Sequence, residues 1–141
     1  MPIRQAFCNS FKRELLAMAP HRPEDVYKIA LYSQAARLDA STTVYSAVNE
    51  VPESGSYVAG GQVLSGFSVT LDGETACLDW TVDPLWNDAT IAAAGALIYN
   101  ASRGNRALAV LDFGGVITST NGPFRVTLPV PAAGTALIRI D

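Results

Sequence analysis

Residues 66–80 decide the fold, because GFSVTL and ETACLDW flank the dipeptide Asp72-Gly73 there. Asp-Gly accepts positive φ at both central positions of a type I′ turn, which predicts a β-hairpin. Side chains alternate between the two faces of a strand. One face would carry Phe67, Val69, Leu71, Ala76, Leu78 and Trp80, and the other Ser68, Thr70, Thr75, Cys77 and Asp79. We expect the apolar face in the core and the polar face in water.

Strand patterns recur over much of the chain. Residues 26–33, VYKIALYS, are rich in β-branched and aromatic residues, which favour a strand. Residues 95–100 and 106–113 are apolar on both faces, as central strands are, and the short glycine-containing loop between them indicates a second hairpin. Apolar and polar residues alternate again at 124–128 and 136–140. About seven or eight strands are therefore expected.

The N-terminal segment has the spacing of a helix and not of a strand. Phe7, Phe11, Leu15 and Met18 recur at helical spacing, so residues 4–17 are expected to form one amphipathic helix. Such a helix usually packs on its own sheet, although docking on a partner stays open.

Two further segments lack a clear strand pattern. Residues 40–51 fit either a strand or a short helix, and we favour the helix. Residues 81–91 contain Pro84 and a polar cluster, so an irregular crossing is expected. Together these patterns predict one domain over residues 1–141, an antiparallel β-sandwich, jelly-roll-like, with one N-terminal helix.

Composition limits the classes of function. A chain of 141 residues that is 49% hydrophobic can bury one core. Its formal charge of −3 gives no reason to expect binding to nucleic acid. Cys8 and Cys77 are far apart in sequence and are expected to be buried free thiols. No apolar run is long enough for a signal peptide or a membrane span, so we expect synthesis in a cytoplasm and no membrane partner.

The sequence predicts no catalytic residue, no cofactor and no metal. Its only histidine, His21, lies between Pro20 and Pro23 and is expected to be an exposed loop residue. Asp83, Asn87 and Asp88 could offer oxygen ligands to calcium but lack the pattern of a dedicated site. Four aromatic residues could form a stacking platform for sugars, although core packing is favoured. They are Tyr57, Trp80, Trp86 and Tyr99.

One resemblance covers nearly the whole chain. The segments that carry it are FKRELL, VYKIALYSQAARLDASTTVYSAVNEV, YVAGGQVLSG, GALIYNASRGNRALAVLDFGG, STNGPFRVTLP and ALIRI, in that order between Phe11 and Arg139. This order resembles a family of small virion proteins of tailed bacteriophages. The chain departs from the family pattern at residues 20–23, PHRP, where relatives have a Gly/Asp-rich turn.

The resemblance implies a virion structural protein, similar to the capsid decoration or cement protein of Bordetella-type podophages. Such a protein binds the outside of the capsid shell between capsomers, so its partners would be the major capsid protein and further copies of itself, as a dimer or trimer. Small-residue loops, which allow close approach of another subunit, are the candidate contacts: Gly60, Gly61, Gly114, Gly115, Pro129, Pro131 and Gly134. A tail or neck protein and a glycan-binding module on the particle stay open as alternatives, and an enzyme is the weakest.

Overall fold

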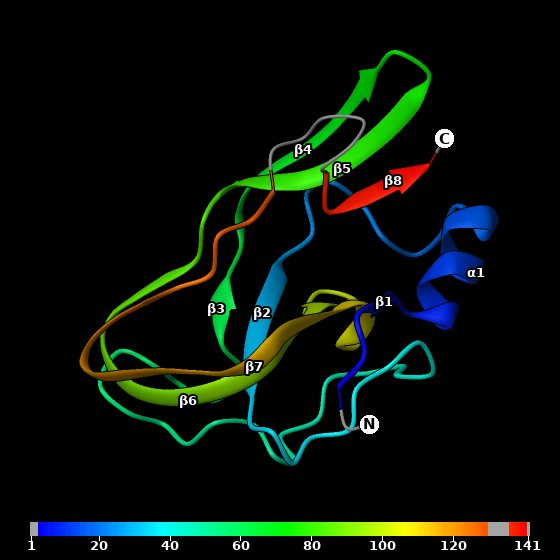
Figure 1. Ribbon diagram of the computed structural model, residues 1–141. Helices are drawn as coiled ribbons and strands as arrows, with labels where there is room; N and C mark the ends of the chain where they lie inside the picture. The colour runs from blue at the N-terminus through cyan, green and yellow to red at the C-terminus, as the bar shows by residue number, and fades with distance from the viewer. Residues whose placement is uncertain (1–2, 130–135, 141) are drawn as a thin grey trace.

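The computed structural model describes residues 3–129 and 136–140, and it is built mainly of strands (Figure 1). In chain order the elements are β1 (Ala6–Phe7), α1 (Asn9–Ala17), β2 (Tyr27–Tyr32), β3 (Gln62–Val63), β4 (Ser65–Asp72), β5 (Thr75–Val82), β6 (Leu85–Asn100), β7 (Arg106–Arg125) and β8 (Ile138–Ile140). The expected mainly-β fold, an antiparallel sandwich with one helix near the N-terminus, is confirmed.

The strands form two antiparallel sheets. The larger has the order β1-β7-β6-β2-β3, and the smaller has the order β4-β5-β8. The β4–β5 hairpin projects away from the larger sheet in Figure 1. The two sheets meet at Tyr27 of β2, whose ring stacks on Phe67 and tilts against Trp80, with ring centroids 5.6 and 5.5 Å apart.

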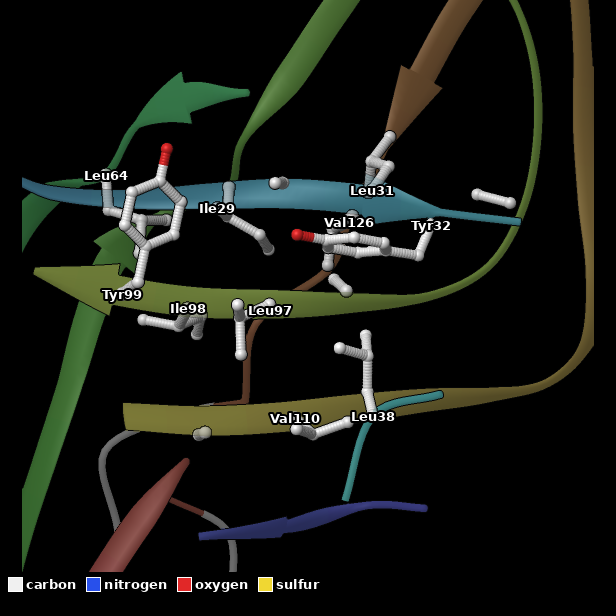
Figure 2. Packing of buried hydrophobic residues seen from close by; sticks show 14 of the residues in the cluster. Ile29, Leu31, Tyr32, Leu38, Leu64, Leu97, Ile98, Tyr99, Val110 and Val126 are labelled. Atoms are coloured by element: carbon white, nitrogen blue, oxygen red, sulfur yellow. The ribbon is translucent and has the colours of Figure 1, made fainter. Parts of the chain in front are cut away.

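The core is centred on β2, β6 and β7. Ile29, Leu31, Leu97 and Ile98 are fully buried, since both faces of these strands are covered. Figure 2 shows these side chains together with Leu38 and Val126, which reach the core from outside the strands. The predicted strand at 26–33 and the predicted hairpin at 95–113 are both confirmed, because β2 pairs with β6 and β6 with β7.

The β6–β7 hairpin is longer than its sequence suggests. The expectation of an irregular crossing at 81–91 is wrong, because β6 begins at Leu85, directly after Pro84. A proline just before a strand removes no ladder hydrogen bond, and the Pro84 carbonyl accepts one from Val126 N at 3.0 Å. Shifts of register along β6 hide the alternation that would mark a strand.

The helix is shorter than predicted. Residues 6–7 extend the edge of the larger sheet by pairing with Val110 and Ala109 of β7, so α1 begins at Asn9. Phe11 is buried, as the spacing predicted, but Met18 is 91% exposed in the left-handed conformation that ends the helix. The predicted start of the helix at residue 4 is therefore wrong, and so is the prediction that Met18 belongs to its apolar stripe.

No helix forms at residues 40–51. The segment follows the edges of two strands, with Val44 bridged to Arg106 and Glu50 bridged to Tyr32. Val51 N donates to Leu31 O at 3.0 Å, so the backbone of this loop is bound to β2. The predicted short helix is wrong because these bonds to distant strands replace helical ones.

Candidate functional site

The β4–β5 hairpin confirms the predicted pairing but with a different turn. Asp72 pairs with Thr75, so the two loop residues are Gly73 and Glu74 rather than Asp72 and Gly73. In this loop only Gly73 has positive φ, at 60°, which fits a type II′ turn. The cross-strand pairs still place the predicted apolar side chains on one face, in the rungs Phe67–Trp80, Val69–Leu78 and Leu71–Ala76.

That apolar face is buried at its base and also at Ile138 of β8, which lies opposite the half-buried Leu78. Phe67 and Trp80 pack on Tyr27, whereas Val69 is 60% exposed and Leu71 is 73% exposed farther along the hairpin. β8 extends the face, since Ile140 lies opposite Ala76 and is 58% exposed. We call Val69, Leu71, Ala76, Leu78 and Ile140 the apolar hairpin face. Contiguous exposed apolar side chains on a sheet are typical of an interaction surface.

The other face of β5 is the covered one. Thr75, Cys77 and Asp79 are all buried. The carboxylate of Asp79 accepts hydrogen bonds from Trp80 N at 2.9 Å and Leu137 N at 3.2 Å, so the segment before β8 is fixed to this side. Burial raises the pKa of Asp79 above its usual range. The expectation that the polar face meets water is therefore wrong for β5, although Thr70 on β4 is exposed as expected.

Gly60 and Gly61 lie inside the molecule's own contacts. Gly60 N donates to a Glu50 carboxylate oxygen at 2.8 Å, and Gly60 O accepts from the Tyr99 hydroxyl at 2.5 Å. Gly61 passes so close to β2 that a Cβ would lie 1.8 Å from Ile29 O. Their small size serves this close approach.

The remaining small-residue positions that the structure describes lie in β7 or shortly after it. Gly114 and Gly115 are exposed in β7 with open space around them. Pro129 borders a groove of about 460 Å³ beside β7, lined also by Phe113 and Phe124. Pro131 and Gly134 lie outside the described residues. The five candidate contacts that the structure describes are thus not gathered on one face.

Glu50 organises a group of tyrosines that sequence reasoning did not connect. Its carboxylate accepts hydrogen bonds from the hydroxyls of Tyr45 at 2.5 Å and Tyr57 at 2.6 Å, besides that from Gly60 N. The Tyr45 ring stacks on Tyr99 with centroids 4.7 Å apart. Burial, together with the hydrogen bond to Glu50, raises the pKa of Tyr57 far above its usual value. This cluster fixes the loop at 45–61 against the larger sheet.

The four candidate stacking residues do not present a platform. Trp80, Trp86, Tyr57 and Tyr99 are all buried, and Trp86 packs against Tyr57 and Phe124. The preference for core packing is confirmed, although Trp86 lies in β6 and not in a loop.

His21 is a buried link in a polar network. Its ring Nε2 donates to Glu14 at 2.7 Å, and its Nδ1 accepts from Asn100 Nδ2 at 2.9 Å. The side chain is only 8% exposed, so the expectation of an exposed loop histidine is wrong. The short segment between the helix and β2 folds back on the 101–105 turn, a long-range contact with no local sequence signal.

Two ion pairs complete this network. Arg106 donates to Glu14 at 2.8 Å, and Arg103 binds Asp25 through two nitrogens at 3.0 and 3.1 Å. Hydrogen bonds from Arg103 and Asn100 lower the pKa of Asp25 to about 2. Burial opposes ionisation of Glu14, but hydrogen bonds from His21 and Arg106 outweigh it and lower the pKa of that carboxyl.

The candidate calcium ligands are not brought together as a site. Asp83 accepts a hydrogen bond from Leu128 N at 2.9 Å, while Asn87 and Asp88 are exposed on β6. Among the described residues, no group of three His, Cys, Asp or Glu side chains could hold a metal ion. Cys8 and Cys77 are both buried free thiols, as expected.

No family model, no curated protein and no solved structure matches this chain. Over residues 3–129 and 136–140, no helix has the length and apolar character needed to cross a membrane.

Proposed function

We propose that this chain is a capsid decoration, or cement, protein of a tailed bacteriophage. It is made in the host bacterial cytoplasm, binds the outer surface of the capsid shell between capsomers, and stabilises the shell. Its partners are the major capsid protein and further copies of itself. The sequence resemblance motivates this function, and the apolar hairpin face is the observation that carries it.

The apolar hairpin face suits attachment to a protein shell. Val69, Leu71 and Ile140 expose more than half of their surface on a paired strand, so they need no rearrangement before binding. Full burial of such a side chain contributes about 1.5 to 3 kcal/mol. Binding that favours the assembled shell over separated capsomers raises the stability of the shell by mass action.

The shell is also the occupant that best fits the composition of this face. Its side chains are Val, Leu, Ala and Ile. Among the charged residues of the hairpin, Asp72 and Glu74 lie at the turn, and Asp79 is buried on the opposite face of β5. A flat uncharged face bordered by polar residues is typical of the centre of a protein interface. The network at His21 holds the segment between α1 and β2 in place, and we assign it no catalytic role.

Particles of the encoding phage that lack this protein should assemble heads but rupture at a lower temperature. Leu71→Asp should release the protein from particles, with affinity lowered about 100-fold, because a carboxylate would be buried against the shell. Thr70→Asp is the matched control, since Thr70 is exposed on the opposite face of the same strand and should stay bound. Cosedimentation with particles measures both.

Copy number separates this proposal from a tail or neck role. A shell protein is expected at hundreds of copies per particle, whereas about six or twelve copies would point to the tail axis. Particles equally heat-resistant with and without the protein, or equal release of the two variants, would contradict a cement role.

A further inference from the structure

The outer edge of β4 is a long, regular strand edge at the margin of the smaller sheet. β4 has eight residues and, among the described residues, pairs with β5 alone. The other outermost strands, β1, β3 and β8, have two or three described residues each. Figure 1 shows β4 on the outer side of the projecting hairpin. The unpaired N–H and C=O groups along such an edge can bind a further strand.

β4 lacks the features that protect strand edges from pairing. Charged side chains, prolines and bulges are the usual protection. β7, which extends beyond its pairing with β1, carries Asp112 and Arg125 and has shifts of register with β6. Residues 65–71 of β4 include no charged residue and no proline, and the pairing of β4 with β5 is unbroken over residues 67–72. This edge is therefore open to a partner strand.

The turn determines which backbone groups of β4 point outward. Asp72 pairs with Thr75 across the two-residue loop, so the backbone groups of Asp72 point toward β5. Successive residues of an antiparallel strand direct their N–H and C=O groups to opposite sides. The N–H and C=O groups of Phe67, Val69 and Leu71 therefore point away from β5, and no described residue binds them. Each of the three residues offers one donor and one acceptor to a neighbouring strand.

The side chains along this edge suit a second copy of the same strand. Antiparallel pairing about a two-fold axis at Val69 places Val69 opposite Val69 of the second copy, and Phe67 opposite its Leu71. Every outward residue then exchanges backbone hydrogen bonds with another outward residue. On the other face of the strand, Ser68 lies opposite Thr70. Any other axis along these five residues brings fewer apolar side chains opposite one another.

Electrostatic repulsion does not oppose this pairing. Two identical strands bring like charges together wherever a charged residue lies near the axis, and such pairs are destabilising. The nearest charged residue of β4 is Asp72, which this register places opposite Gly66 of the second copy. A protein whose formal net charge is −3 thus has an uncharged edge along which two copies can approach.

We propose that two copies of this chain associate by antiparallel pairing of β4 with β4, which forms one continuous sheet in the order β8-β5-β4-β4-β5-β8. The two-fold axis is perpendicular to this sheet, so the apolar hairpin faces of both copies lie on the same side and join at Val69. Val69, which is 60% exposed in the single chain, gains a direct apolar neighbour across the axis. The pairing uses the backbone edge of β4 and not its side-chain face, so it does not depend on the proposed function.

The first test is sedimentation equilibrium of the isolated full chain, which should show a concentration-dependent dimer. Val69→Lys should raise the dissociation constant of the dimer about 100-fold or more, because two ammonium groups would face each other across the axis. Val69→Glu should have the same effect. An equal mixture of the two variants should dimerise again, because Lys then lies opposite Glu. Loss of an apolar side chain alone would not produce this recovery.

Hydrogen exchange of the unaltered protein tests the register. The amides of Val69 and Leu71 should be protected at concentrations at which the dimer forms, and they should exchange rapidly after dilution to the monomer. The amide of Thr70, which points toward β5, should stay protected at both concentrations. This measurement needs no substitution, so it tests the pairing even where a variant unfolds.

Val58→Lys is the matched control for the charge variants. Val58 is 57% exposed, close to the value for Val69, but it lies in the loop before β3, so its substitution should leave the dissociation constant unchanged. A monomer at all concentrations up to about 1 mM, a trimer, or a mixture of Val69→Lys and Val69→Glu that stays monomeric would overturn the proposal. Equal effects of Val58→Lys and Val69→Lys would also overturn it.

Discussion

Gly61 illustrates how a single residue determines the position of a loop. Its φ is +84°, and a Cβ would lie 1.8 Å from Ile29 O and 2.8 Å from Ala30 Cα. The contact is with backbone, which cannot move aside without disturbing β2. Only glycine allows the loop and the strand to approach this closely.

Gly61→Ala should lower the free energy of unfolding by about 3 kcal/mol or more, since it adds a backbone clash to left-handed strain. Gly73→Ala is the matched control. Gly73 also has positive φ, at 60°, but nothing lies within 4 Å of its Cβ position, so a loss of about 1 kcal/mol is expected. Urea denaturation measures both, and equal losses would mean that the close approach to β2 contributes nothing.

Asp25 connects the segment before β2 to the 101–105 turn by an ion pair with Arg103. Its carboxylate accepts from Arg103, Asn100 Nδ2 and Arg22 N, and its side chain is only 4% exposed. The pKa of about 2 lies below the value of about 3.9 expected in the unfolded chain. The ionised form is therefore favoured by folding. Its contribution to stability is complete above about pH 5 and is lost as the pH falls toward 2.

Asp25→Asn should lower the free energy of unfolding by about 2 kcal/mol at neutral pH, because the charge-assisted hydrogen bonds are lost. The difference between wild type and Asp25→Asn should then shrink as the pH falls from 5 to about 2. Asp88→Asn, which removes an exposed carboxylate on β6 that forms no ion pair with any described residue, should cost little at either pH. A difference between wild type and Asp25→Asn that stays constant over this range would contradict the assignment.

At the scale of elements, local patterns predicted strands better than connections. The hairpin pairing at 66–80 was available from alternation, and β2 from its β-branched and aromatic residues. The helix predicted at 40–51 failed because hydrogen bonds to β2 and to the 101–105 turn decide that segment. Such partners lie far away in sequence, and no local period records them.

Glu50 carries much of the order in that loop. Its carboxylate is the acceptor for the Tyr45 and Tyr57 hydroxyls and for Gly60 N. Tyr57 in turn accepts from Leu31 N at 2.9 Å, so the chain of hydrogen bonds ends in β2. One carboxylate thus connects the loop with the centre of the larger sheet.

Glu50→Ala should lower the free energy of unfolding by about 3 kcal/mol, because three donors lose their acceptor in a mostly buried position. Hydrogen exchange of the Gly60 amide should accelerate more than that of amides in β7. Glu53→Ala is the control, since within the described residues the Glu53 carboxylate accepts a single hydrogen bond, from Ala59 N, in an exposed part of the loop. If both variants lose the same stability, the tyrosine cluster does not hold the loop.

At the scale of the whole molecule, the fold class followed from strand periodicity, but the exposure of the hairpin did not. Alternation identifies two faces and cannot say which one another part of the chain will cover. Here the segment near Leu137 binds Asp79 on the polar side, and Val69, Leu71 and Ile140 stay exposed on the apolar side. The candidate attachment surface was thus misassigned to the core.

Tyr27 is the point where the two sheets are coupled. Its ring contacts Phe67 and Trp80, which form the rung next to the apolar hairpin face, and its hydroxyl donates to Arg22 O at 2.7 Å. This contact holds the base of the hairpin on the larger sheet. Cooperativity of unfolding should therefore depend on the ring of Tyr27 more than on its hydroxyl.

Tyr27→Ala should lower the free energy of unfolding by about 4 kcal/mol and separate the unfolding of the two sheets, because it leaves a cavity between them. Hydrogen exchange in β4 and β5 should accelerate while β6 and β7 keep their protection. Tyr27→Phe, which keeps the ring and removes only the hydroxyl bond, should cost about 1 kcal/mol and leave a single transition. A single transition in Tyr27→Ala, with uniform loss of protection, would place the coupling of the sheets elsewhere and remove the basis for a preorganised hairpin face.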